Sequence, residues 1–215
     1  MLSFILSASF SPSQSNRPEN NLIMRTTRSN HSRITIHCPV ILLLLLMLQA
    51  PSPTFAGSAT WLATPATDDW NTAGNWAAGG PPNGTADVAV FDTSATTAVS
   101  LSANTQADGI AFNAGASAYT ITVSPASMLI LGGVGITNNS DAPQSFVAAA
   151  EKAGAGHGMI EFINSATAGN DTHFTAAGAT TVPGWDGGFI GFFDTATAGS
   201  ATFTTNGGST EWAWS

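Results

Sequence analysis

The chain has 215 residues, of which 43% are hydrophobic, only 8% are charged and 22 are glycine. An average soluble domain has about 25% charged residues, so most of this surface must be uncharged. The net charge is −8, and all four arginines lie between positions 17 and 33. Residues 57–215 therefore keep twelve acidic residues against one cation, Lys152, for a net charge of −11. Such a surface repels phosphate, which excludes nucleic-acid binding and disfavours anionic membranes.

Residues 1–56 have the layout of an export signal. The basic segment 17–33 precedes an apolar run, Val40–Leu48, and two prolines then lead to the small residue Ala56. This order is typical of a secretory signal peptide, and the apolar run is shorter than the roughly 20 residues that span a bilayer. The alternative, a buried core helix, lacks a polar face beside the leucines. We predict a signal-peptide helix cleaved after Ala56, export from a Gram-negative cell, and no stable membrane span after cleavage.

Two details of the leader bear on the exported product. A start at Met24 instead of Met1 would give a signal of more ordinary length. Cys38, the single cysteine, lies before the apolar run, whereas a lipoprotein cysteine would follow it. The exported chain therefore has no cysteine, which excludes disulfides, thiol catalysis and thiolate metal sites. We expect one domain stabilised by burial and backbone pairing.

An internal repeat gives the strongest structural signal. Residues 160–180 (IEFINSATAGNDTHFTAAGAT) match residues 190–210 (IGFFDTATAGSATFTTNGGST), with Ile160 aligned to Ile190 and ten identical positions. The period of about 30 residues lies within the range of roughly 20–50 that indicates a solenoid, a propeller or an array. A propeller blade needs four strands, and the chain is too short for enough blades. We predict an all-β parallel β-helix, or β-solenoid, over residues 85–215.

Short alternating runs between turn residues supply the expected strands. Residues 141–156 resist this pattern, because Pro143–Ala153 is rich in helix formers that Asp141 could cap. We favour a strand there, with a loop or one helical turn. The expected core positions of the repeats are Ile160, Phe162, Phe174, Ile190, Phe192 and Phe203. The other expected strands are Asp87–Phe91, Ala98–Leu101, Ile110–Phe112, Tyr119–Val123, Met128–Leu131, Gly135–Thr137, Thr172–Thr175 and Ala201–Thr204.

Residues 57–84 form a tryptophan-rich segment that contains Trp61, Trp70 and Trp76. Large apolar rings can cover the open end of a stack of strands. The same rings could instead stack on sugars. We favour an N-terminal cap.

These features resemble a known family. The stretch from Trp70 to Trp76, followed by Pro82-Asn83 and Asp87–Phe91, is similar to the opening of secreted bacterial proteins with autotransporter-associated β-strand repeats. The segment ATAGSATFTTNGG, residues 196–208, looks like the repeat itself. The resemblance covers residues 57–215 and implies a right-handed parallel β-helix on, or released from, a bacterial surface. The chain lacks a C-terminal membrane β-barrel and a Val-Pro-Glu-Pro sorting signal, so we interpret it as a truncated or degenerate member.

The sequence offers little material for catalysis. Polysaccharide lyases on β-helices need bases and Arg or Lys, and hydrolases need clustered carboxylates. The adjacent pair Asp68-Asp69 belongs to the tryptophan-rich segment, where a turn is the simpler explanation. His157 and His173 lack a partner at a recognised spacing, and in the alignment of the two repeats His173 matches Phe203 in a slot of the stack. The remaining acidic residues look like strand ends and turns, and no spacing specifies calcium.

We therefore assign no catalytic, cofactor-binding or metal-binding residue. The expected function is a non-enzymatic structural or adhesion module, secreted or on the cell surface, whose partners are extracellular polysaccharide or host and cell-surface components. The alternative is a polysaccharide-binding or polysaccharide-degrading β-helix protein that uses Trp61, Trp70, Trp76 and the aspartate pair. A minor alternative is an ice-binding threonine array. Its ladders would be Thr172/Thr202, Thr175/Thr205 and Thr180/Thr210.

Overall fold

The computed structural model describes residues 57–77, 80–152, 154–179 and 186–208. The predicted signal-peptide helix, its cleavage site, and Thr180 and Thr210 lie outside these residues. Within the described part, every named element except one short 3-10 helix (η1, Ala73–Asn75) is a β-strand. The expectation of an all-β chain is confirmed.

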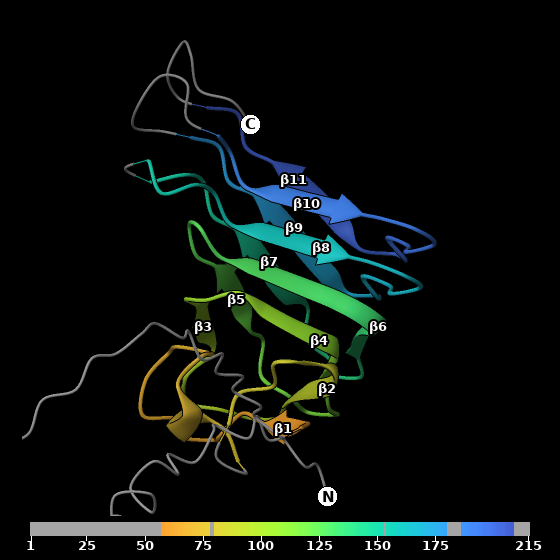
Figure 1. Ribbon diagram of the computed structural model, residues 1–215. Coiled ribbons are helices and arrows are strands. Elements are labelled where there is room, and N and C mark those ends of the chain that lie inside the picture. Colours follow the sequence, from red (N-terminus) through yellow and green to blue (C-terminus); the bar gives the residue numbers. More distant parts are fainter. Residues whose placement is uncertain (1–56, 78–79, 153, 180–185, 209–215) are drawn as a thin grey trace, which may run out of the picture. The chain divides into compact units, whose positions relative to one another are not determined.

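The strands form two parallel sheets that wind into five coils (Figure 1). The first sheet has six strands in the order β1-β2-β4-β6-β8-β10, and the second has five in the order β11-β9-β7-β5-β3. Because each coil adds one strand to each sheet, every pairing between named strands is parallel, as in a β-solenoid. The bounds are β1 Ala59–Thr60, β2 Gly84–Phe91, β3 Ala98–Leu101, β4 Thr105–Phe112, β5 Thr120–Val123, β6 Met128–Asn138, β7 Gln144–Ala148, β8 Met159–Phe162, β9 Thr172–Ala176, β10 Phe189–Phe192 and β11 Thr202–Thr205.

Most expected strands lie at or near their predicted positions. The run Ala98–Leu101 is β3, while the two separate runs expected between positions 128 and 137 join into the single long strand β6. Residues 141–156 contain the strand β7, in which Ala148 takes the extended conformation that its pairing with Val123 and Ala176 imposes. Helix propensity is a weak preference that tertiary pairing overrides here.

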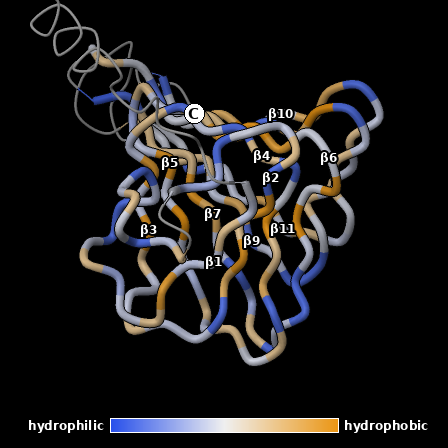
Figure 2. The backbone as a smooth tube through the Cα atoms, turned by 60° about the horizontal axis from the view of Figure 1, so that its bottom comes forward, coloured by the Kyte–Doolittle hydropathy of each residue, from blue (hydrophilic) through white to orange (hydrophobic). Residues whose placement is uncertain are grey.

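Side chains alternate between the interior and the outer surface along each strand. In the strand β7, for example, the first, third and fifth residues are buried and the second and fourth are partly exposed. In Figure 2 hydrophobic residues lie along the strands, and many of the hydrophilic residues lie in the bends between them. Registered pairing brings equivalent inward residues of successive coils together in ladders. One ladder of the five-stranded sheet consists of Val99, Ile121, Phe146, Phe174 and Phe203.

Aromatic rings of successive coils stack in the interior. Phe146 and Phe174 have ring centroids 4.9 Å apart, and Phe174 and Phe203 follow at 5.2 Å. On the opposite sheet, Phe162 and Phe192 stack at 4.8 Å. The four phenylalanines expected in the core of the repeats therefore point inward. Phe203 is nevertheless 42% exposed, because it belongs to the last described coil and has no further described ring above it.

The register of the last coil corrects the alignment of the repeats. In the structure Phe203 pairs with Phe174 and Thr202 pairs with His173, whereas the alignment matched Phe203 with His173. The turn after Gly199 has one residue fewer than the turn after Gly169, which shifts the following strand by one position. A one-residue shift moves every side chain to the other face of a strand. His173 therefore lies on the outer face and not in the slot of Phe203.

A buried polar network joins the coils at β5 and β7. Gln144 is fully buried, and its Nε2 donates hydrogen bonds to Ser117 O, Ser140 Oγ and Ala142 O. Its Oε1 accepts the backbone N–H of Tyr119 at 2.8 Å. Buried polar groups need such partners, so this network fixes how the two coils meet.

The hydroxyl of Tyr119 extends this network and donates to the backbone oxygen of Asp92 at 2.6 Å. Burial is the main reason that the pKa of Tyr119 is raised from 10.0 to about 12. The hydrogen bond with Ser94 lowers this pKa, and the negative charge of Asp92 raises it further. The folded state therefore holds the phenol proton more tightly than the unfolded state does. The resulting stabilisation is complete below pH 10 and is lost as the pH rises through about 12. It amounts to at most about 2 kcal/mol, because solvent screens part of the effect.

Urea unfolding at a series of alkaline pH values tests this assignment. Between pH 10 and about 12 the unchanged protein should lose stability more steeply than Tyr119→Phe, which has no phenol proton to release. The variant should retain its fold, because the aromatic ring is kept. Equal slopes in the two proteins would contradict the assignment.

Candidate functional site

The three tryptophans form a closed cluster at the first coil. The centroids of Trp61 and Trp76 are 5.1 Å apart, those of Trp70 and Trp76 are 4.9 Å apart, and all three rings contact Phe91. Their Nε1 atoms donate to three backbone oxygens, one of them that of Trp70. None of the three residues is more than 2% exposed. The rings therefore cover the interior at β2 and present no face on which a sugar could stack.

The aspartate pair beside these rings builds a turn. Asp69 Oδ2 accepts the Thr72 hydroxyl at 3.1 Å, and the Asp69 backbone oxygen accepts Asn75 Nδ2 at 2.7 Å. The backbone oxygen of Asp68 accepts the N–H of Ser100, while the Asp68 side chain is exposed. Asp69 Oδ2 and the Asp69 backbone oxygen thus make turn contacts that position η1, while Asp69 Oδ1 is buried and has no hydrogen-bond partner among the described residues. The two carboxylates differ in exposure, since the Asp68 side chain is exposed.

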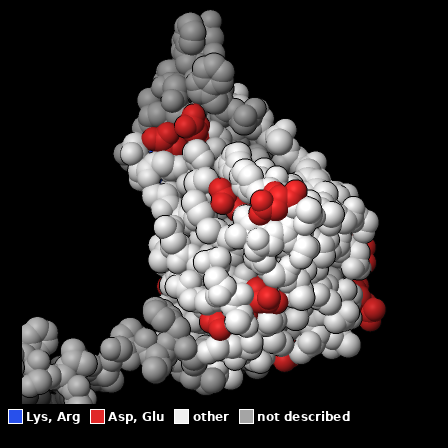
Figure 3. Space-filling view, turned by 45° about the vertical axis from the view of Figure 1, so that its right-hand side comes forward, with Lys and Arg blue, Asp and Glu red and all other residues white. Residues whose placement is uncertain are grey.

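Other aspartates bind backbone N–H groups of neighbouring turns. Asp87 accepts the N–H of Asn83, and Asp194 accepts the N–H of Asn164 from the preceding coil at 3.0 Å. Asp171 and Asp194 have φ values of 48° and 55°, which fits their expected role as turn residues. Acidic side chains are spread over the visible surface in small separate groups (Figure 3). Among the described residues, no three His, Cys, Asp or Glu side chains are grouped to hold a metal.

Threonines on the outer face of the five-stranded sheet do not form a uniform array. Thr172, expected in an exposed ladder, is buried and donates its hydroxyl to Ala168 O at 2.8 Å. The expected pairs Thr172/Thr202 and Thr175/Thr205 are wrong because of the one-residue shift described above. His173 lies on this face and is hydrogen-bonded to the Thr202 hydroxyl. One outward ladder is interrupted by a valine and consists of Ser100, Thr122, Val147, Thr175 and Thr204.

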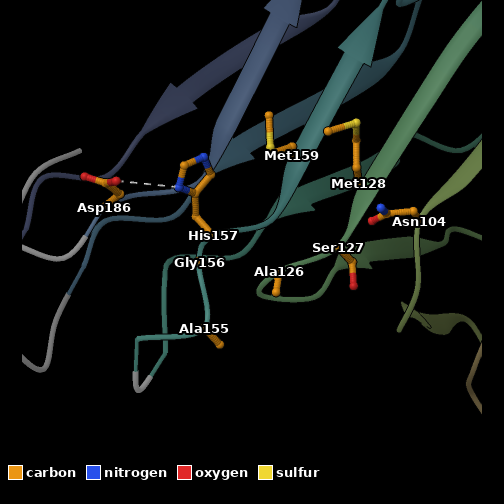
Figure 4. Close-up of a pocket in the computed structure, with 9 residues that line it drawn as sticks. All are labelled: Asn104, Ala126, Ser127, Met128, Ala155, Gly156, His157, Met159 and Asp186. Atoms are coloured by element: carbon orange, nitrogen blue, oxygen red, sulfur yellow. Dashed lines mark ion pairs between the residues drawn. The ribbon is translucent and has the colours of Figure 1, made fainter.

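A pocket lies on the outer side of the six-stranded sheet, where the strands β6 and β8 begin (Figure 4). It has a volume of about 420 Å³, and its walls come from the turn before β6, the loop before β8, and Asp186. His157 Nδ1 lies 3.9 Å from Asp186 Oδ2, and the two side chains are 25% and 62% exposed. Nδ1 itself is buried and has no hydrogen-bond partner among the described residues.

Backbone pairing fixes the position of His157 relative to the turn before β6. The carbonyl of His157 accepts the N–H of Ala126 at 3.1 Å, and the N–H of Met159 donates to Ser127 O at 3.0 Å. Gly158 allows this close approach, because a Cβ there would lie 2.2 Å from Val123 O. The Ser127 hydroxyl is directed away from His157 (Figure 4), so the two do not form a nucleophile and base pair.

A second pocket of about 220 Å³ adjoins the first and shares Asn104 and Met128 with it. A third, of about 330 Å³, lies beside Phe192 and Phe203 at the last described coil. Residue type singles out His157 in the sequence, but nothing in the sequence pattern points to Met128 and Met159 beside it. Strand pairing is the signal that connects them, because Met128 and Met159 are registered partners.

No family model, curated protein or solved structure matches this chain. In the part of the chain that the structure describes, no helix has the length and hydrophobicity needed to cross a membrane.

Proposed function

We propose that the protein is a non-enzymatic structural or adhesion module, secreted or on the surface of a bacterial cell, of the kind that carries autotransporter-associated β-strand repeats. One observation carries the proposal: the three tryptophans and most of the aspartates considered for sugar binding or catalysis instead help to build the coils. The tryptophans cover the interior, and Asp69, Asp87 and Asp194 bind turn hydroxyl or backbone groups. A stack built in this way presents the same backbone ladder repeatedly along its length.

The proposal predicts no turnover of polysaccharide. The purified protein would be incubated with pectin, alginate, chitin and cellulose, and released reducing sugar would be measured beside an Asp68→Ala/Asp69→Ala variant. We expect no release from either protein. Because Asp69 positions η1, the variant's circular dichroism spectrum must match that of the unchanged protein. Release that disappears in a folded variant would overturn the proposal.

Polysaccharide binding without turnover is the second candidate. The two adjoining pockets that share Asn104 and Met128 favour it, because together they form an extended depression on the outer face of the six-stranded sheet. Retardation of the protein in gels that contain the same polysaccharides would support this candidate. If Asn104→Ala loses this retardation and Asp68→Ala/Asp69→Ala keeps it, polysaccharide binds at these pockets and not at the aspartate pair.

A further inference from the structure

Two methionines lie side by side on the outer face of the six-stranded sheet. Met128 of β6 and Met159 of β8 are registered partners in parallel strands, and both side chains are partly exposed. Neighbouring strands are about 4.8 Å apart, so two thioether sulfurs can reach one common point above the sheet. Both methionines line the 420 Å³ pocket (Figure 4).

His157 brings a nitrogen to the same place. It precedes Met159 by two positions, a spacing that puts both side chains on one face of an extended segment. Its Nδ1 faces Asp186, whereas Nε2 lies on the side of the ring nearer Met159 (Figure 4). Histidines that bind metals commonly place a carboxylate at the other ring nitrogen, which orients the ring and raises its basicity. Asp186 is in the position for that role.

We propose that Met128 Sδ, Met159 Sδ and His157 Nε2 form a binding site for a soft monovalent metal ion, Cu(I). Thioether sulfur prefers Cu(I) over hard cations, and imidazole accepts copper as well. Ca²⁺ and Mg²⁺ prefer several oxygen ligands, and Asp186 is the single carboxylate among the described residues that line this pocket. Glu161 lies two positions beyond Met159 on the same strand, and the described lining residues include no lysine or arginine. The local charge therefore attracts a cation.

The test measures Cu(I) affinity of the full chain under reducing conditions by competition with a chromophoric Cu(I) chelator. Cys38 is replaced by serine in every sample, because a thiol in the leader would bind Cu(I) by itself. We expect the protein with both methionines to bind one equivalent of Cu(I) at this site, and we expect the double variant Met128→Leu/Met159→Leu to lose it. Each single Met→Leu change and His157→Gln should weaken binding more than about tenfold, the lower end of the effect of removing a supporting group. Asp186→Asn should weaken it by about that factor.

Two matched controls separate the site from general surface effects. His173→Gln removes the other described histidine, which lies on the opposite sheet, and Ile130→Leu alters the neighbouring outward position of β6 without removing a ligand. Both should keep the wild-type affinity, with unchanged circular dichroism in all variants. Unchanged affinity in folded Met128→Leu/Met159→Leu, or equal losses in His157→Gln and His173→Gln, would overturn the proposal. Zn²⁺ that displaced Cu(I) at equal concentration would also contradict it.

Discussion

Replacing Phe146 with alanine is expected to lower the free energy of unfolding by about 3–5 kcal/mol. The ring is fully buried, it stacks on Phe174 with centroids 4.9 Å apart, and it meets Phe112 edge-on at 6.2 Å. Its removal leaves a cavity between coils that the flanking backbone ladders hold at a fixed spacing. Urea unfolding followed by circular dichroism would measure the loss.

Phe203→Ala is the matched control for this change. Phe203 belongs to the same inward ladder and stacks on Phe174, but it is 42% exposed. Its truncation removes less buried surface and opens no enclosed cavity, so the loss should be less than half of that for Phe146→Ala. Equal losses in the two variants would contradict the exposed position of the last coil.

Gly135→Ala should destabilise the protein by more than about 4 kcal/mol, which is exceptional for a single substitution. Gly135 has a φ of 79°, a left-handed conformation that costs other residues about 1–2 kcal/mol. A Cβ there would lie 2.2 Å from Thr167 O and 2.4 Å from Thr167 N. These are backbone atoms of the next coil, so the clash forces the coils apart. The yield of folded protein and its midpoint of urea unfolding would report the loss.

Gly115→Ala isolates the contribution of close packing. Gly115 has a φ of 78°, nearly the same as Gly135, but no atom of the described residues lies within 4 Å of the place where a Cβ would be. Its replacement should cost only the conformational penalty of about 1–2 kcal/mol. A loss as large as that of Gly135→Ala would show that backbone conformation, and not contact between coils, sets the requirement for glycine.

The solenoid could be predicted because strand pairing repeats inward apolar residues at alternate positions. Ile160 and Phe162 recur as Ile190 and Phe192, and the structure pairs them as the alignment does. The next strand could not be placed by matching letters. The threonine-rich residues 202–205 align with the preceding repeat nearly as well when they are shifted by one position. The stacking of Phe203 on Phe174 selects the shifted register.

The pocket could not be predicted because the coils differ in length. The coil that leads from Phe91 to its partner Phe112 is much shorter than the coil that leads from Met128 to its partner Met159. No single period therefore places the two methionines together, and they look unrelated in the sequence. His157 has no acidic partner near it in the sequence, because Asp186 reaches it only where the loop before β8 meets the segment before β10.

The parallel register also determines how this molecule responds to tension. Hydrogen bonds between partners such as β8 and β10 join one coil to the next, so a pull along the stack loads successive interfaces in series. Among the described coils, we expect the last to detach first, because two short strand pairings and partly exposed rings hold it. Detachment of the coil that leads from Ile160 to its partner Ile190 would add about 100 Å of extended chain. We expect a stack of this kind to lengthen in steps under load, while the tryptophan cluster at the first coil stays closed.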